Sequence, residues 1–339
     1  MMNAYRSVSI VGAGVAGLCI ATELVKRGIM PSIFEQQSEP GPASCSWWAG
    51  GMLAPYCEGE SAEDAVVYHG KKAASWWQQN TGLVTQKGTL VLALNRDQSE
   101  LRRFAKRTEA YEVLDAAKIT NLEPDLDERF SQGLLYNNEA HLAPRECLQA
   151  LKTSLVNKGV QFTYQKADLK AFNKDTLVID CRGIKAKPDT PNLRGVKGEM
   201  LILRCTSLHL TRPIRLLHPR IPLYIVPRGD GIYMLGATMI ESSAKQQATV
   251  RSVMELLNAA YALNPAFGEA EILEIGVDSR PAFSDNLPKI SHQGQVIRAN
   301  GLYRHGFLLA PMLATMLADY IHLGTKPQWL TTCKQELST

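Results

Sequence analysis

The residues with the clearest chemical potential begin with a glycine-rich segment close to the start of the chain. It reads Gly12-Ala-Gly14-Val-Ala-Gly17 and directly follows a short apolar run. The first glycine permits a tight turn, the second lets backbone approach a pyrophosphate, and the third lets a helix pack closely on the preceding strand. The N-terminus of that helix attracts phosphate groups. The spacing therefore predicts a dinucleotide-binding site.

An acidic residue at the end of the next apolar run supports this prediction. Glu35 stands 18 residues after Gly17 (35 − 17), where its carboxylate can accept hydrogen bonds from ribose hydroxyls and repel a 2′-phosphate. A chance glycine turn in a helical hairpin is the alternative, but strand, turn, helix, strand and acid occur in order. The motif leaves NAD and FAD open, and its position near the N-terminus favours FAD.

The elements that must position these residues alternate between strands and helices. A long irregular segment, 38–60, contains Trp47, Trp48 and Met52, which argue against disorder and for a functional loop. The pattern predicts an α/β fold, in which an antiparallel-sheet domain is inserted into a discontinuous Rossmann-like dinucleotide-binding domain. Strands are expected at 7–11, 31–34, 89–94, 160–164, 176–180, 199–204, 223–226, 231–236 and 271–277, and helices at 18–27, 61–80, 98–130, 144–158, 250–263 and about 311–323.

The composition argues against several classes of protein. The formal charge is 37 − 33 = +4 without a Lys/Arg run, so we expect no nucleic-acid binding. Seven cysteines without a CxxC pair predict neither a disulfide framework nor zinc, and they favour the cytoplasm. The seven histidines show no HExxH spacing, so we expect no metal. The apolar run 308–321 is shorter than the roughly 20 residues of a membrane span, and cleavage of a signal peptide at 7–18 would destroy the glycine motif.

Five further motifs carry a resemblance to a known family. They are Ala49-Gly-Gly-Met-Leu-Ala-Pro55, Gly198-Glu-Met200, Tyr224-Ile-Val-Pro-Arg228, Gly236-Ala-Thr-Met239 and Tyr303-Arg-His-Gly-Phe-Leu-Leu-Ala-Pro311. As an ordered set they resemble the D-amino-acid-oxidase family, and within it they are most similar to the glycine oxidases of thiamine biosynthesis. The resemblance covers roughly residues 6 to 325, and the ordered set carries it rather than any single motif.

The resemblance implies FAD as the cofactor. It also implies an FAD-binding domain at 1–80, 140–190 and 272–339 and a substrate domain at 81–139 and 191–271. Covalent relatives attach the flavin to a C-terminal cysteine, and 206–332 contains none, so we expect noncovalent FAD. The positions that match cofactor contacts are Gly12, Gly14, Val15, Ala16, Gly17, Glu35, Gln36, Cys45, Ser46, Gly50, Gly51, Met52, Asp168, Leu302, Tyr303, Arg304, His305, Gly306, Phe307 and Leu308.

The same resemblance assigns the substrate end of the site. Arg280 matches an arginine that clamps the substrate carboxylate, Tyr224 matches its phenol partner, and Arg304 matches a further arginine. Met52 and Met239 match pocket-lining positions, and large thioethers there suit a substrate as small as glycine. For Arg280 and Arg304 the alternative is a structural ion pair, and for Tyr224 and Met239 it is packing in the core.

Three histidine and aspartate positions leave questions open. Asp278 places an acid two residues before the expected clamp, where the family usually has a small or aliphatic residue. If Asp278 points inward, it weakens carboxylate binding or recruits the amine. His305 replaces the asparagine usual in its turn, and His218 either edges the pocket or has a structural role, with the structural role favoured.

The implied function is oxidative deamination of glycine or another small amino acid, which consumes O2 and yields ammonia and hydrogen peroxide. In thiamine biosynthesis the imine product would supply thiazole formation. One alternative is a D-amino-acid or sarcosine-type oxidase or dehydrogenase of the same family. Others are a non-catalytic flavin-binding protein and a Rossmann NAD dehydrogenase. Relatives are often oligomeric, which suggests a homo-oligomer.

Overall fold

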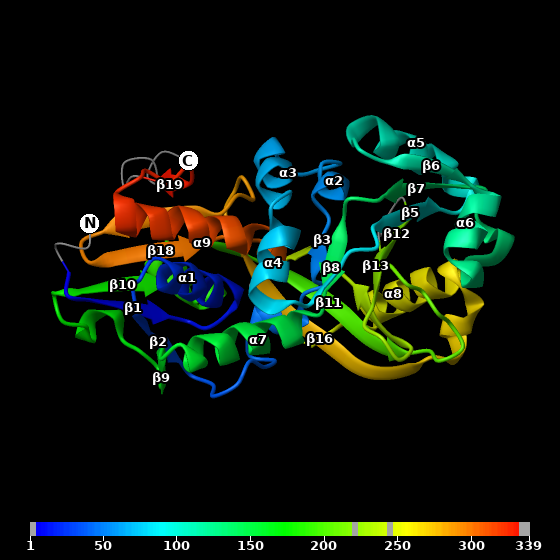
Figure 1. The fold of residues 1–339 in the computed structure, drawn as a ribbon. Helices are drawn as coiled ribbons and strands as arrows, with labels where there is room; N and C mark the ends of the chain where they lie inside the picture. The colour runs from blue at the N-terminus through cyan, green and yellow to red at the C-terminus, as the bar shows by residue number, and fades with distance from the viewer. Residues whose placement is uncertain (1–4, 219–222, 243–246, 332–339) are drawn as a thin grey trace.

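The structure is a computed structural model that describes residues 5–218, 223–242 and 247–331. Two large sheets lie at opposite ends of the molecule, and short helices lie between them (Figure 1). A three-stranded sheet of β3 (Met52–Leu53), β8 (Ala140–Leu142) and β4 (Val84–Thr85) accompanies them. This mixture of sheets confirms the predicted α/β class.

The first large sheet has seven strands, in the order β19-β17-β18-β10-β1-β2-β9. All its pairs are parallel except β17 with β18, and residues far apart in sequence meet in it. It comprises β1 (Ser7–Val11), β2 (Pro31–Glu35), β9 (Gln161–Tyr164), β10 (Thr176–Asp180), β17 (Lys289–Gln293), β18 (Val296–Asn300) and β19 (Leu330–Thr331).

The second large sheet has nine strands and is antiparallel except where β12 pairs with β5. Its order is β15-β11-β14-β13-β12-β5-β7-β6, and β16 pairs with β11 along nearly its whole length. It comprises β5 (Thr89–Ala93), β6 (Glu112–Asp115), β7 (Gln132–Tyr136), β11 (Arg194–Arg204), β12 (Ile214–Leu217), β13 (Leu223–Pro227), β14 (Ile232–Gly236), β15 (Ile240–Glu241) and β16 (Glu271–Ala282).

Helices cover both sheets and connect them. In Figure 1, α1 lies between α9 and α7 beside the seven-stranded sheet and contacts both helices, and α8 packs against the nine-stranded sheet. Trp77 links α4 to α9, because its Nε1 donates to the carbonyl oxygen of Phe307 at 2.7 Å. The helices are α1 (Val15–Lys26), α2 (Pro55–Glu58), α3 (Asp64–Gly70), α4 (Ala73–Thr81), α5 (Gln98–Arg107), α6 (Ala116–Leu122), α7 (Pro144–Asn157), α8 (Val250–Leu263) and α9 (Gly306–Leu323).

The turn between β1 and α1 shows why glycines occur there. Gly12 has φ of +105°, a conformation that other residues rarely adopt. A Cβ on Gly17 would lie 1.9 Å from the Gly12 carbonyl oxygen, so only glycine lets α1 pack this closely. The apolar residues of β1 and α1, including Ile10 and Leu18, are fully buried in the core beneath.

Two predicted helices differ in the structure. The expected helix at 61–80 is two helices, α3 and α4, and the close packing of Gly70 against Leu308 places α3 beside α9. The charged segment 98–130 contains a strand, β6, between α5 and α6. Leu114 is the single buried residue of that edge strand, so its sequence carries little strand pattern.

The domain boundaries remain a prediction. The seven-stranded sheet draws its strands from 7–35, 161–180 and 289–331, and the nine-stranded sheet draws its own from 89–136 and 194–282. β16 therefore lies in the nine-stranded sheet, although most of its residues fall within the segment 272–339 that was assigned to FAD binding.

The last helix is longer than its sequence pattern suggested. α9 begins at Gly306 and has 18 residues, so by length and composition it could cross a membrane. More than half of it, 56%, is buried inside the protein. Such burial is typical of the core helix of a soluble fold.

Candidate active site

One cavity of about 660 Å³ connects the two large sheets. At one end it is lined by the carboxyl ends of β1 and β2 and by the start of α1. At the other end it is lined by side chains from β12, β13, β14 and β16. Clefts at the carboxyl ends of parallel strands are common ligand sites in α/β proteins.

The first end combines a helix N-terminus with an acidic side chain. Gly14 is the N-cap of α1 and no side chain caps it, while the Oγ of Ser46 accepts the N–H of Val15 at 3.0 Å. Glu35 accepts the N–H of Ala13 at 2.8 Å through Oε2. The positive end of the helix dipole at this N-terminus suits a phosphate, and the carboxylate suits a ribose.

One cavity-lining residue at this end, Arg182, was not singled out from the sequence. It follows β10 and pairs with Asp180 at 2.8 Å and with Asp189 at 2.6 Å. Its position after a third parallel strand is the signal that could have identified it.

Asp168, which was predicted to contact the cofactor, does not line the cavity. Its Oδ1 accepts the N–H of Lys170 at 3.0 Å and caps a short helical turn.

Hydrogen bonds from a buried arginine fix the position of the segment Gly50–Met52. Arg228 donates to the carbonyl oxygen of Gly50 at 2.6 Å and to that of Leu142 at 3.0 Å. Burial lowers the pKa of Arg228 to about 10. Gly51 has φ of +70°, and a Cβ there would lie 2.2 Å from the Leu142 oxygen. The segment is thus fixed in a conformation that requires glycine.

The turn before α9 brings a second helix N-terminus to the cavity. Gly306 and Phe307 line it, and no side chain caps the helix. Tyr303 adopts φ of +50°, and its N–H donates to the carbonyl oxygen of Pro281 at 2.9 Å, which ties this turn to β16. His305 lies behind the turn, where burial lowers its pKa to about 4, so it is neutral at physiological pH.

Arg280 reaches the cavity from β16. Its Nη1 donates to the carbonyl oxygen of Thr238 at 3.1 Å, and among the described residues no carboxylate lies within ion-pair distance of it. Burial lowers its pKa. Gly198 on β11 makes room for this side chain, since a Cβ there would lie 2.2 Å from Nη2. Asp278 also lines the cavity, and its Oδ1 accepts the N–H of Ser279 at 2.7 Å.

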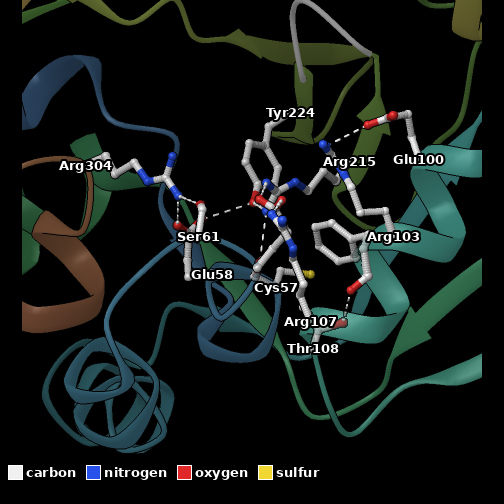
Figure 2. Close-up of polar contacts among 12 residues, drawn as sticks. Cys57, Glu58, Ser61, Glu100, Arg103, Arg107, Thr108, Arg215, Tyr224 and Arg304 are labelled. Atoms are coloured by element: carbon white, nitrogen blue, oxygen red, sulfur yellow. Dashed lines mark hydrogen bonds and ion pairs between the residues drawn. The ribbon is translucent and has the colours of Figure 1, made fainter.

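A glutamate that sequence reasoning missed joins two of the predicted residues (Figure 2). Glu58, at the end of α2, pairs through Oε2 with Arg304 at 2.7 Å and accepts through Oε1 from the Tyr224 hydroxyl at 3.1 Å. Arg215 donates to the same hydroxyl at 2.6 Å. Burial opposes ionisation of Glu58, but the charges of Arg304 and Arg215 and the hydrogen bond from Tyr224 prevail and lower its pKa to about 2. Glu58 is therefore ionised at neutral pH.

Methionines supply much of the apolar wall at this end. Met52 and Met239 line the cavity as the resemblance implied, and Met200 and Met234 line it as well. Met239 is 50% exposed, and its sulfur lies 3.6 Å from both the Tyr303 hydroxyl and an Arg304 nitrogen. It therefore stands at the solvent side of the cavity.

Comparison with known proteins agrees with this arrangement. The model of a family described as FAD dependent oxidoreductase, DAO, matches residues 7–320. The chain belongs to this DAO family. A relative from Rhizobium etli, whose name assigns it provisionally to thiamine biosynthesis as the oxidoreductase ThiO, is 49% identical over 91% of this chain and 94% of its own.

Glycine oxidases are also similar to this DAO-family chain. The enzyme of Bacillus licheniformis is 25% identical over 99% of this chain and 98% of its own. The crystal structure of glycine oxidase from Bacillus cereus superimposes with a TM-score of 0.80 at 23% identity, over 96% of this chain and 99% of that one. The structural likeness shows that the fold is shared.

The cavity of this DAO-family protein fits FAD. At Gly12 and Gly51 a Cβ would lie 2.6 and 2.2 Å from backbone oxygens, so backbone lines the cavity closely. The Glu35 carboxylate lines the cavity at a place where it could accept hydrogen bonds from a ribose, and two helix N-termini, those of α1 and α9, face the cavity. Cys45 and Ser46 line the stretch between the two ends.

Most of the predicted cofactor positions line this cavity. Gly17, Asp168, His305 and Leu308 do not, and the first packs α1 on β1 while the last packs against Gly70. The predicted substrate residues Arg280, Tyr224, Arg304, Met52 and Met239 all line it, and His218 does not. Which of these residues contact FAD or substrate stays a prediction.

No metal cluster is present in the described part of the chain, where no group of three or more His, Cys, Asp and Glu side chains could hold an ion. The six cysteines of that part form no disulfide bond with one another, and Cys333 lies outside the described residues.

Proposed function

We propose that this protein oxidises glycine, or another amino acid with a very small side chain, to the imine and then the 2-oxo acid. The observation that carries the proposal is Arg280, a guanidinium without a carboxylate partner in the described residues, in the same cavity as the dinucleotide features. The names of the Rhizobium and Bacillus relatives support the same substrate and a place in thiamine biosynthesis.

The proposed reaction begins with binding of the substrate carboxylate. Arg280 presents two parallel donors to it, which orients the substrate and neutralises its charge. Met52 and Met239 line the cavity, and bulky thioethers there would favour a substrate with little or no side chain on Cα. Bound FAD would accept a hydride from the Cα–H bond and pass two electrons to O2. With water the balance is glycine, O2 and H2O giving glyoxylate, NH3 and H2O2.

The chain's own residues supply orientation rather than a strong base. Glu58 has a pKa of about 2 and is engaged by Arg304 and Tyr224, so it does not remove a proton at neutral pH. His305 is neutral but lies outside the cavity lining. Neither residue therefore serves as the base for the amine, and positioning accounts for much of the rate.

Anaerobic reduction of the purified protein tests this proposal. We expect a visible flavin band that glycine bleaches without oxygen and that returns with stoichiometric peroxide when air is admitted. A band bleached by D-alanine or sarcosine but not by glycine would move the substrate within the family, and reoxidation without peroxide would indicate a dehydrogenase. A yellow protein that no amine bleaches would indicate flavin binding without turnover.

Three accompanying properties are part of the proposal. FAD is noncovalent, so acid precipitation should leave all of the flavin in the supernatant. The protein acts in the cytoplasm, where O2 and glycine are both available. It forms a homo-oligomer, which sedimentation would measure.

A further inference from the structure

Glu58 lies at the substrate end of the cavity, and nothing in the proposed reaction uses its charge. Its carboxylate contacts Arg304 at 2.7 Å and Tyr224 at 3.1 Å, and the side chain is only 9% exposed (Figure 2). His305 lies 3.5 Å behind the same oxygen that Arg304 contacts. The carboxylate thus lines the cavity in a position that Arg304 and Tyr224, which line it as well, hold in place.

The charges at this end leave room for one anion. Three guanidinium groups, Arg215, Arg280 and Arg304, and two carboxylates, Glu58 and Asp278, line it. The formal charge is 3 − 2 = +1. Glu58 engages Arg304, and Arg215 donates to the Tyr224 hydroxyl and to the Cys57 carbonyl oxygen at 3.1 Å and pairs with Glu60 at 3.8 Å. Arg280 is the guanidinium of this set that has no carboxylate partner among the described residues; its Nη1 donates to the Thr238 carbonyl oxygen.

We propose that Glu58 is a specificity-determining residue that restricts the site to amines carrying a single carboxylate. The first carboxylate of a substrate binds Arg280. A second carboxylate, on the amine nitrogen or on Cα, would meet the fixed negative charge of Glu58 and would find Arg304 already neutralised. A positively charged or neutral amine meets no such penalty. This inference deepens the proposed function and rests on it for the identity of the amine substrate.

The size of the effect follows from the placement of like charges. Two negative charges brought together in a partly desolvated site disfavour binding strongly, so we expect discrimination on the order of 30-fold or more. Substituting Gln for Glu58 removes the charge, keeps the shape and leaves Arg304 available to a second anion. The preference for ligands with one carboxylate over ligands with two should then nearly disappear or reverse.

The test compares two ligands that cannot be oxidised. Methoxyacetate carries one carboxylate, and diglycolate carries two around the same ether oxygen, which replaces the amine. Their dissociation constants are measured on the FAD-loaded protein by calorimetry and by perturbation of the flavin spectrum. The wild-type protein should bind methoxyacetate at least about 30-fold more tightly than diglycolate. Equal affinities in the wild-type protein would overturn the proposal without any variant.

Variants then assign the effect to Glu58. Glu58→Gln should bring the two dissociation constants within about threefold, while Glu58→Asp, which keeps the charge, should retain most of the discrimination. The matched control is Glu63→Gln, which removes an exposed carboxylate five residues away and outside the cavity lining, and it should keep the wild-type ratio. A folded, FAD-loaded Glu58→Gln protein with the wild-type ratio, or an equal change in Glu63→Gln, would refute the assignment.

Turnover separates this inference from the proposed function. With substrates, Glu58→Gln should raise kcat/KM for iminodiacetate relative to glycine by a similar factor. If the wild-type protein oxidises neither amine but the ligand ratios behave as expected, the proposed function fails and the carboxylate restriction stands. If glycine is oxidised and the ratios do not change, the function stands and the restriction fails.

Discussion

Gly198 makes the most direct connection between backbone geometry and substrate binding. An alanine Cβ at this position would lie 2.2 Å from Nη2, 2.4 Å from Cζ and 2.7 Å from Nη1 of Arg280. Non-bonded heavy atoms need about 3.5 Å, so the guanidinium of a Gly198→Ala protein must move by more than about 1 Å. The strand itself can remain, because alanine is tolerated in β-structure and the atoms it meets belong to a side chain.

The expected cost is a loss of carboxylate binding. A displacement of about 1 Å costs on the order of 100-fold in rate, and complete loss of two charge-assisted hydrogen bonds, at roughly 1.5–3 kcal/mol each, sets the upper limit. We therefore expect Gly198→Ala to lower kcat/KM for glycine roughly 100-fold. FAD content should stay at the wild-type level, because Gly198 meets Arg280 and not the dinucleotide end of the cavity.

Steady-state kinetics and anaerobic flavin reduction measure this effect. The matched control is Gly268→Ala, where the added Cβ would meet only the ring of Tyr261, which is 56% exposed and can move. The Arg280→Met background provides the decisive comparison: if Gly198 acts through Arg280, adding Gly198→Ala there should change kcat/KM by less than about threefold. The reasoning is refuted if the 100-fold loss persists in that background, or if Gly198→Ala alone retains wild-type kcat/KM.

Three further predictions concern the supports of the site. Arg228→Met removes the hydrogen bonds to Gly50 and Leu142 and should lower the free energy of unfolding by about 3 kcal/mol and weaken FAD binding, measured by denaturant titration and flavin fluorescence; unchanged FAD affinity would contradict it. Gly51→Ala combines positive φ with a contact to the Leu142 oxygen and should cost more than about 2 kcal/mol, seen as a lower Tm. Burial raises the pKa of Glu139 to about 7, so the folded protein holds a proton that the unfolded chain releases near 4.5; the resulting stability is complete below pH 4.5 and lost as pH rises through 7. Glu139→Gln should therefore gain Tm relative to wild type between pH 5 and pH 8, and a constant difference would show that this carboxyl does not titrate as expected.

The dinucleotide end of the site could be predicted from the sequence because backbone geometry determines it. Gly12 and Gly17 occur where no side chain fits, and Glu35 stands at the end of the second strand, so their spacing alone indicated a phosphate and a ribose. Local rules of this kind operate within one βαβ unit. Elements with a clear apolar pattern, such as β10 and α8, could also be located, because the spacing of their buried residues is visible within one short segment.

The substrate end could not be assembled from the residues alone. Glu58 stands 166 residues before Tyr224 and 246 before Arg304, and only the packing of α2 against the sheet brings the three together. No spacing rule relates them, and the resemblance to a family indicated Tyr224 and Arg304 but not their anionic partner. Short edge elements such as β6 were missed because one buried residue leaves no periodic signal.

Backbone and glycine shape one end of the cavity, whereas side chains shape the other, and this difference has an evolutionary consequence. At the dinucleotide end, Gly12 and Gly17 stand where an added Cβ would clash with backbone atoms, so replacement there is harmful. The substrate end consists of side chains that come from four different elements: α2, β13, β16 and the turn before α9. Single substitutions there can alter which amines are accepted while the redox cofactor stays in place. Such a scaffold can acquire new substrates by gradual drift, and libraries confined to those few positions are the natural starting point for redesigning it.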